Sequence, residues 1–492
     1  MSAVANAETA DAAPSAASVR ERVPDWLVLG LTCFGQFMVI LDASIVNVAL
    51  PSIRSGLGFT PTGLQWVVNS YLLTFGGFLL LGGRSTDLFG RRRMLTAGLV
   101  LFAAASLACG LAPAAGVLVA ARAAQGLGAA ILAPAVLAVL TTRFTEDGAR
   151  GRALSIWAAA GAAGGVLGGV VGGGLTAALS WRWIFLVNVP IGAGLIGVTA
   201  VALVGGHRRG ADDRLDLPGA LSVTAGMALL IYGIVQTDTD GWGSTRVLAP
   251  VVTGLALVGL FVLVEARLAA RPMLPLRLLR SAAVSAGMVL LILVGSLSIG
   301  IWYFASLFFQ NVLGYSAIQT GLALSPAAGS LMVTASCVPV LLSRTGPRRL
   351  VGAGCLCQLV GFGWFAHAGA TSGYPADLLG PTVLVAVGMG LVFTPTTVAV
   401  TSRVTGSDAG IVSGLANASR QLGSSLGLAA LATVATARTE SLLAGHRAGG
   451  QPAALASGYD RVFLVAAGVA VVAGLVSRVL PSRAGRRPPA EP

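Results

Sequence analysis

The chain lacks lysine altogether, has only three histidines and five cysteines among its 492 residues, and only 10% of its residues are charged. The phosphate-binding loop of ATP-driven pumps needs a lysine, so its absence excludes ATP hydrolysis by this chain. The histidines form no HExxH or comparable pair. All five cysteines lie in apolar runs, and Cys355 and Cys357 are too close together for a zinc knuckle. We therefore expect no metal and no cofactor.

Hydrophobic residues make up 55% of the chain, a share that no soluble domain of this length carries without aggregating. A bilayer core of about 30 Å is crossed by roughly 20 apolar residues in a helix. Runs of that length recur from Trp26 almost to the end and predict an all-α integral membrane protein with about fourteen spans. The predicted spans are 26–50, 63–82, 94–112, 116–140, 153–175, 183–204, 217–236, 246–266, 281–309, 319–342, 349–369, 376–401, 409–435 and 461–480.

The location of the positive charge decides what the net charge of +13 means. With the N-terminus inside, most of the 32 arginines flank the cytoplasmic ends of the spans, which is the positive-inside pattern. This distribution indicates anchoring to the lipid bilayer and no nucleic-acid binding. We expect a multi-pass protein of the bacterial inner (plasma) membrane with both termini cytoplasmic, since an even number of spans returns the chain to its starting side. The lysine-free, alanine- and glycine-rich composition suggests a high-G+C bacterium.

A charged interior segment, GGHRRGADDRLD at 205–216, marks a boundary. A weak repeat supports a division there, because GGRSTDLFGRRR after the second span is echoed by SRTGPRR after the tenth. Two such repeats predict two parallel six-helix bundles with two helices inserted between them. We expect a cytoplasmic disordered tail over 1–25, an N-terminal bundle over 26–204, a cytoplasmic loop and two inserted helices over 205–280, a C-terminal bundle over 281–480 and a cytoplasmic tail over 481–492.

Asp42, in the sequence LDASIVNVALP of the first span, is the one acidic residue that falls well inside a predicted span. An ionised carboxylate near the bilayer centre costs about 2.5–3.5 kcal/mol, so this group must be paired or protonated. A buried carboxyl that changes its protonation state is suited to carrying protons across the membrane. We interpret Asp42 as a proton-coupling group; the alternative is an aspartate that only hydrogen-bonds a neighbouring backbone.

The second pattern is GGRSTDLFGRRR at 82–93, between the second and third spans. Gly83 and Gly90 suit a tight turn and a close helix approach, and Asp87 is placed to bond loop amides or a helix N-terminus. Arg91 and Arg92 would hold the loop at the lipid headgroups. This arrangement predicts a conformational latch. A simple positive-inside anchor explains the arginines but not the spacing of glycine and aspartate.

The third pattern, RAAQGLGAA at 122–130, places Arg122 inside the fourth span. Arg122 lies about six residues, or roughly 9 Å, below the outer surface, and Asp42 lies about eight residues, or roughly 12 Å, below it. The two depths agree within the error of the span boundaries. We therefore expect Arg122 to act with Asp42 in proton coupling, the proton affinity changing as the two separate. The alternative is an arginine that snorkels outward without a coupling role.

The fourth pattern, GAAGGVLGGVVGGG at 161–174, is followed by WRWIFLVNVPIG at 181–192. Gly164, Gly165, Gly168 and Gly172 allow close contact between helices and local bending. The same residues also suit generic small-residue packing.

Together these four patterns resemble the major facilitator superfamily, specifically its fourteen-span family of drug:proton antiporters. The resemblance implies a major facilitator fold and proton-motive-force-driven efflux of small organic molecules by alternating access, with no enzymatic activity. It also assigns the glycines of the fourth pattern to an antiporter-like helix. The chain departs from the family at Ser85 and Leu88, where leucine and arginine are usual, and at Gly169, where proline is common.

A candidate substrate cavity is formed by Gln36, Asn47, Asn417 and Arg420. Arg420, in NASRQLG, lies about eleven residues, or roughly 16 Å, from the inner end of its span and so near the midplane. Family members that export divalent cations tend to carry further membrane carboxylates, which spans ten and thirteen lack here. Neutral, anionic or monovalent substrates are favoured. Aromatic residues are candidates for the pocket or for interfacial belts: Trp66, Tyr71, Trp302, Tyr303, Phe308 and Phe309.

Three other functions remain open from the sequence. Nutrient uptake and lipid or metabolite transport use the same fold, so the fold alone does not decide the direction of transport. A membrane-embedded enzyme would need clustered His, Cys, Asp or Glu on facing helices. We expect a monomer whose partners are a small-molecule substrate, protons and the lipid bilayer.

Overall fold

The computed structural model describes residues 24–203, 217–267, 281–369, 371–401, 408–444 and 450–481, and these ranges contain helices and no strand. The N-terminal half consists of α2 (Asp25–Leu57), α3 (Pro61–Leu64), α4 (Trp66–Phe89), α5 (Arg91–Gly110), α6 (Ala115–Arg143), α7 (Asp147–Ala178), α8 (Trp183–Leu186) and α9 (Asn188–Ala202). The next two helices are α10 (Leu217–Asp240) and α11 (Thr245–Arg267). The C-terminal half consists of α12 (Ala282–Ile299), the π-helix η2 (Gly300–Phe304), α13 (Ala305–Asn311), α14 (Ala317–Thr345), α15 (Pro347–Phe365), the π-helix η3 (Tyr374–Leu378), α16 (Leu379–Thr401), α17 (Asp408–Ala444), α18 (Gln451–Val476) and the 3-10 helix η4 (Ser477–Val479).

Each predicted span coincides with helix in the structure, but fewer stretches qualify as membrane-spanning. By length and composition, 10 stretches of the described chain can cross a membrane. The other predicted spans coincide with α4, α10, α15 and α17, which are helical but do not meet the combined requirement of length and hydropathy over their described residues. Within α10, the stretch Leu221–Ile234 is apolar but too short. The all-α membrane architecture is confirmed, and the number of fourteen spans stays a prediction.

Helix ends extend past several predicted boundaries. The predicted spans end at 435 and begin again at 461, whereas α17 continues to Ala444 and α18 begins at Gln451. Polar residues in these extensions contact each other, since Arg438 Nε donates to Ser457 Oγ at 3.3 Å. Apolar runs mark only the lipid-embedded part of a helix, so the polar extensions were missed.

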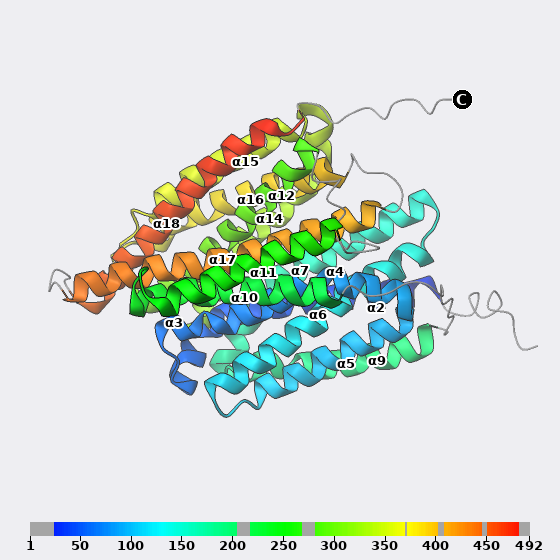
Figure 1. Cartoon of the computed structure of the whole chain (residues 1–492), viewed down its shortest axis with the longest axis horizontal. Coiled ribbons are helices and arrows are strands. Elements are labelled where there is room, and N and C mark those ends of the chain that lie inside the picture. Colours follow the sequence, from blue (N-terminus) through cyan, green and yellow to red (C-terminus); the bar gives the residue numbers. More distant parts are fainter. Residues whose placement is uncertain are drawn as a thin grey trace, which may run out of the picture.

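The same packing pattern occurs in both halves of the chain. In the N-terminal half α2 packs on α7, α4 on α6, α5 on α6 and α5 on α9; in the C-terminal half α12 packs on α17, α14 on α16, α15 on α16 and α15 on α18. The halves meet through α7 with α14 and through α4 with α17, and they form the lower and upper layers in Figure 1. This correspondence is typical of two parallel repeats. The residue boundaries predicted for the domains stay a prediction.

The helices α10 and α11 lie across the seam between the halves, in front of both layers in Figure 1. The helix α10 packs on α4 and α17, and α11 packs on α10. Met227 and Ile231 of α10 form a buried cluster with Leu73 of α4 and Ala429 of α17. The inserted helices therefore cover one side of the seam.

Candidate functional site

Asp42 and Arg122 form a buried ion pair inside the N-terminal half. Arg122 Nη1 donates to Asp42 Oδ2 at 2.7 Å, joining α6 to α2. Their side chains are 1% and 0% exposed. Asp42 and Arg122, for which the sequence predicts similar depths in the membrane, are thus in direct contact. Two charges held this far from water need good geometry and further hydrogen bonds to be tolerated.

Those further hydrogen bonds come from uncharged polar residues on three helices. Gln125 Nε2 of α6 donates to Asp42 Oδ1 at 2.7 Å, and Asn188 Nδ2 of α9 donates to the same oxygen at 2.9 Å. Both amides also donate to Ser106 Oγ of α5, at 2.5 Å and 3.3 Å. Gln125 Oε1 accepts from Arg122 Nη1 at 2.7 Å, so the ion pair and the amides form one connected network.

Arg122 is also held by α4 and by aromatic rings. Its Nε donates to the carbonyl oxygen of Val67 at 2.9 Å. The guanidinium carbon lies 4.2 Å from the ring centroid of Tyr71 and 5.7 Å from that of Phe185. A cation stacked on a ring in a site without water is stabilised by the ring's electrons. Arg122 therefore does not snorkel outward in this structure.

The network around Asp42 connects five helices: α6 and α9 bond the carboxylate of α2 directly, α4 joins through Arg122, and α5 joins through Ser106. Every side-chain partner of the Asp42 oxygens is an N–H donor, and donors favour the ionised carboxylate. Burial alone would favour the neutral acid. The protonation state of Asp42 is thus tied to the relative positions of these helices.

Gln125, Asn188 and Ser106 were not among the residues singled out from the sequence. Gln125 lies three residues after Arg122, a spacing that places both on one helix face, so this signal was present in the third pattern. Asn188 stands in the fourth pattern, but nothing in the sequence connects it to Asp42. Ser106 has no sequence signal, because single serines are common in apolar helices.

The helix α7 packs closely on α2 through glycines. A Cβ atom at Gly164 would lie 2.7 Å from the carbonyl oxygen of Phe37, and one at Gly172 would lie 2.8 Å from that of Ile45. Gly168 is equally tight against Ser44, whose Oγ donates to the carbonyl oxygen of Gly165 at 2.9 Å. Spaced by four residues, Gly164, Gly168 and Gly172 share one helix face.

A second glycine face of α7 contacts the C-terminal half. A Cβ atom at Gly173 would lie 2.5 Å from the carbonyl oxygen of Ala317 on α14, and one at Gly169 would lie 3.6 Å from Gly321 Cα. No proline interrupts α7 between Asp147 and Ala178, so the family's usual proline kink is absent from this described helix. In the predicted orientation this contact lies toward the outer ends of α7 and α14.

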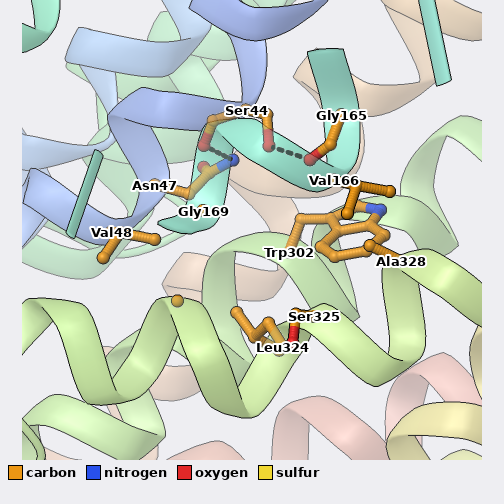
Figure 2. A pocket seen from close by; sticks show the side chains of 11 residues that line it. Ser44, Asn47, Val48, Gly165, Val166, Gly169, Trp302, Leu324, Ser325 and Ala328 are labelled. Atoms are coloured by element: carbon orange, nitrogen blue, oxygen red, sulfur yellow. Dashed lines mark hydrogen bonds between the residues drawn. The ribbon is translucent and has the colours of Figure 1, made fainter. Parts of the chain in front are cut away.

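The two halves leave little space beside this contact. Figure 2 shows Ser44 and Asn47 facing Trp302 and Ser325. The void that these residues line has a volume of about 10 Å³, roughly the space that one water molecule needs. Nearby, Gln310 Nε2 donates to the carbonyl oxygen of Val48 at 3.0 Å. The halves are therefore closed against each other toward the predicted outer side.

The segment 82–93, for which the sequence predicts a loop between two spans, is mostly helical. The helix α4 continues to Phe89 and α5 begins at Arg91, so Gly90 alone makes the turn, with φ +88°. In this segment α4 comes closest to α6 at Gly82, where a Cβ atom would collide with the carbonyl oxygen of Ala130. At Gly83, the glycine that the sequence singles out, a Cβ atom would lie 3.8 Å from Pro134 Cβ, an ordinary contact. The helix continues because nothing before Gly90 breaks it.

Only one of the predicted latch side chains has a described bond to another helix. Arg92 Nη2 donates to the carbonyl oxygen of Ala200 on α9 at 3.2 Å, and Arg91 is exposed. The side chain of Asp87 lies outside the described part of the structure.

The residues predicted to form the substrate cavity do not come together at one point. Gln36 is half-buried beside Gly161 of α7, and Asn47 lines the small void in Figure 2. Arg420 and Asn417 lie on α17 of the other half, where Asn417 is exposed and Arg420 is half-buried.

A family model for the Major Facilitator Superfamily matches residues 32–428. The chain belongs to this superfamily. A cephamycin export protein of Amycolatopsis lactamdurans is 44% identical over 463 residues, covering 94% of this chain and 93% of the relative. A puromycin resistance protein of Streptomyces alboniger is 37% identical over 460 residues, covering 92% and 90%.

Solved superfamily structures show the same fold at low identity. A peptide transporter solved with sulfate aligns with a TM-score of 0.66 and 15% identity, covering 95% of this chain and all of that one. A D-xylose–proton symporter aligns with a TM-score of 0.65 and 14% identity, covering 93% and 98%. The predicted major facilitator fold is confirmed, and the chain is a multi-pass membrane protein.

Proposed function

We propose that this protein exports small organic molecules from the cytoplasm across the bacterial inner membrane in exchange for protons. Its similarity to export and resistance proteins over nine-tenths of the chain supports efflux rather than uptake. Cephamycins and puromycin are accordingly the first substrates to test.

The buried pair of Asp42 and Arg122 carries the proposal of proton coupling. The closed network holds Asp42 by three N–H donors, an arrangement suited to the ionised carboxylate. If α2 and α6 move apart, Asp42 loses its countercharge while staying in an apolar surrounding, and the neutral acid becomes favoured. One proton then binds Asp42 from the outer side, and it leaves toward the cytoplasm when the pair forms again.

Alternating access needs a contact that opens on the outer side, and α7 is suited to that role. Its face with Gly164, Gly168 and Gly172 stays with α2, while its face with Gly169 and Gly173 meets α14 of the other half. Separating α7 from α14 would open the outer side while keeping the close contact of α7 with α2. On the inner side we assign the latch to the segment 82–93, where the bond from Arg92 to α9 holds the start of α5 in place within the N-terminal half.

The arginine distribution supports an orientation with both termini in the cytoplasm. One chain contains both halves and the interface between them, so we propose that a monomer transports. The cargo is a small molecule and the coupling ion is the proton.

The growth-inhibitory concentrations of cephamycins, puromycin and a varied antibiotic panel test this function. The host is an efflux-deficient bacterium that expresses wild type, Asp42→Asn or Asp25→Asn at matched membrane levels. Asp25 is a suitable control because it lies on the same helix but 65% exposed, in a surface pair with Arg143. We expect resistance in wild type and Asp25→Asn and its loss in Asp42→Asn.

Full resistance in Asp42→Asn would contradict its role in proton coupling. No resistance to any compound in wild type would point to uptake or lipid transport instead of efflux.

A further inference from the structure

Arg420 is a cation near the middle of α17 for which the described residues provide no acidic partner. Its Nε is buried and has no hydrogen-bond partner. Other arginines of the described residues do have acidic partners: Arg122 pairs with Asp42, Arg143 with Asp25 and Arg246 with Asp240. Membrane-embedded charges are expensive and are retained mainly for function. Arg122, the other arginine well inside a predicted span, is paired with Asp42, whereas Arg420 has no acidic partner among the described residues.

The surroundings of Arg420 suit an anion attached to an apolar group. The guanidinium carbon of Arg420 lies 5.4 Å from the ring centroid of Phe393 on α16. An apolar ring therefore lies directly beside the positive charge. Asn417, three residues earlier on the same helix, is exposed and offers an amide donor on the same side. The side chain of Arg420 is itself only half-buried, so part of it remains accessible.

Tyr71 connects this cation to the proton-coupling network. Its ring stacks on Arg122, and its hydroxyl is buried without a hydrogen-bond partner. Tyr71 lies on α4, which packs on α17 beside Arg420: Ser425 Oγ of α17 donates to Asn69 Oδ1 of α4 at 3.0 Å, and a Cβ atom at Gly76 of α4 would meet Gln421 of α17. A buried hydroxyl without a partner at this helix contact is a further donor for an anion bound at Arg420.

We propose that Arg420 binds the carboxylate of an anionic substrate, with the Tyr71 hydroxyl and the Asn417 amide as further donors and Phe393 against the apolar part. This inference rests on the proposed transport function and specifies its substrate class. A guanidinium is suited to the task, because its planar fork donates two parallel hydrogen bonds to a carboxylate. Asp42, already neutralised by Arg122, does not compete for Arg420.

The experiment compares a carboxylic acid with its own ester, which differs mainly in the charge. The probes are cefoxitin, a β-lactam with one carboxylate, and its methyl ester. Binding to the purified full chain is followed by intrinsic tryptophan fluorescence, and transport is followed in proteoliposomes. The variants are Arg420→Gln, Arg420→Lys and the control Arg438→Gln, an arginine farther along the same helix that bonds Ser457.

We expect Arg420→Gln to raise the Kd and KM for the acid at least about tenfold, equivalent to about 1.4 kcal/mol, and to change those for the ester less than about threefold. Arg420→Lys restores part of the affinity for the acid, since it keeps the charge but loses the fork. Arg438→Gln leaves both probes unchanged. Partial recovery in Arg420→Lys also shows that the loss in Arg420→Gln is not misfolding.

Equal weakening of acid and ester in Arg420→Gln would overturn the proposal and assign Arg420 a structural or coupling role. Failure of the wild type to prefer the acid over the ester would overturn it as well. The proton-coupled function fails separately: Arg420-dependent binding of the acid without flux under a pH gradient would support the anion site and contradict proton-driven export.

Discussion

Replacing Asp42 with asparagine should destabilise the N-terminal half far more than the loss of one charge at the surface would. Asp42 accepts hydrogen bonds from Arg122 and Gln125 at 2.7 Å and from Asn188 at 2.9 Å. An asparagine at this position keeps only one acceptor oxygen. Whichever way its amide is turned, its NH₂ group points at an N–H donor, either that of Arg122 or those of Gln125 and Asn188. Arg122 is then left buried without a countercharge. Breaking a buried pair in this way costs about 3–5 kcal/mol.

A double-mutant cycle isolates the pair from other effects. We expect Asp42→Asn and Arg122→Gln each to lower the free energy of unfolding by several kcal/mol, of order 3–5 when one partner stays charged. The double variant leaves no uncompensated charge. Its loss in free energy of unfolding should be about 0.5–3 kcal/mol smaller than the sum of the losses in the two single variants. The free energies come from reversible denaturation in mixed micelles. As a control, the exposed pair of Asp25 and Arg143 should show a coupling below about 1 kcal/mol.

Additive effects of the two single substitutions would refute this reasoning. They would mean that Asp42 and Arg122 do not stabilise each other in the membrane protein, whatever their distance.

Further predictions use neighbouring glycines as matched pairs. Gly173→Leu should prevent α7 from closing on α14 and lower the transport rate at least about tenfold. At Gly174 a Cβ atom would meet nothing within 4 Å. Gly174→Leu should therefore keep the transport rate within about twofold of the wild type. In the first variant, a cysteine at Ser325 should react faster with an impermeant maleimide added outside; an unchanged rate would argue against α7 as the outer gate. Gly82→Ala should lower the free energy of unfolding by about 1–3 kcal/mol through collision with α6. Gly83→Ala should raise it by roughly 0.5–1 kcal/mol through helix propensity, and equal effects of the two would contradict the packing of α4 on α6.

The sequence identified the membrane architecture because apolar runs of helical length are a direct physical requirement of the bilayer. It also indicated that Asp42 and Arg122 belong together, since two opposite charges at similar depth in the first and fourth predicted spans have few other partners. The contact at 2.7 Å agrees with that inference, while its role in proton transport stays a prediction.

The rest of the network could not be read from the sequence. Asn188 and Ser106 are ordinary polar residues in apolar helices, and only the packing of α9 and α5 brings them to Asp42. The spacing of the glycines in α7 sorts them onto two helix faces. It does not say which helix each face contacts. The charges of the segment 82–93 mark a membrane boundary and therefore predict a loop, but charge does not prevent a helix from continuing into water.

Proton movement coupled to substrate flux in proteoliposomes tests the central claim most directly. A pH-sensitive dye in the lumen reports protons while a substrate gradient drives transport, with wild type and Asp42→Asn compared at equal amounts of monodisperse protein. We expect wild type to move protons against the substrate, and Asp42→Asn to exchange substrate for substrate without moving protons. Retained exchange would show that the variant is folded. Proton movement by Asp42→Asn at the wild-type rate would contradict the assignment of Asp42 as the proton carrier.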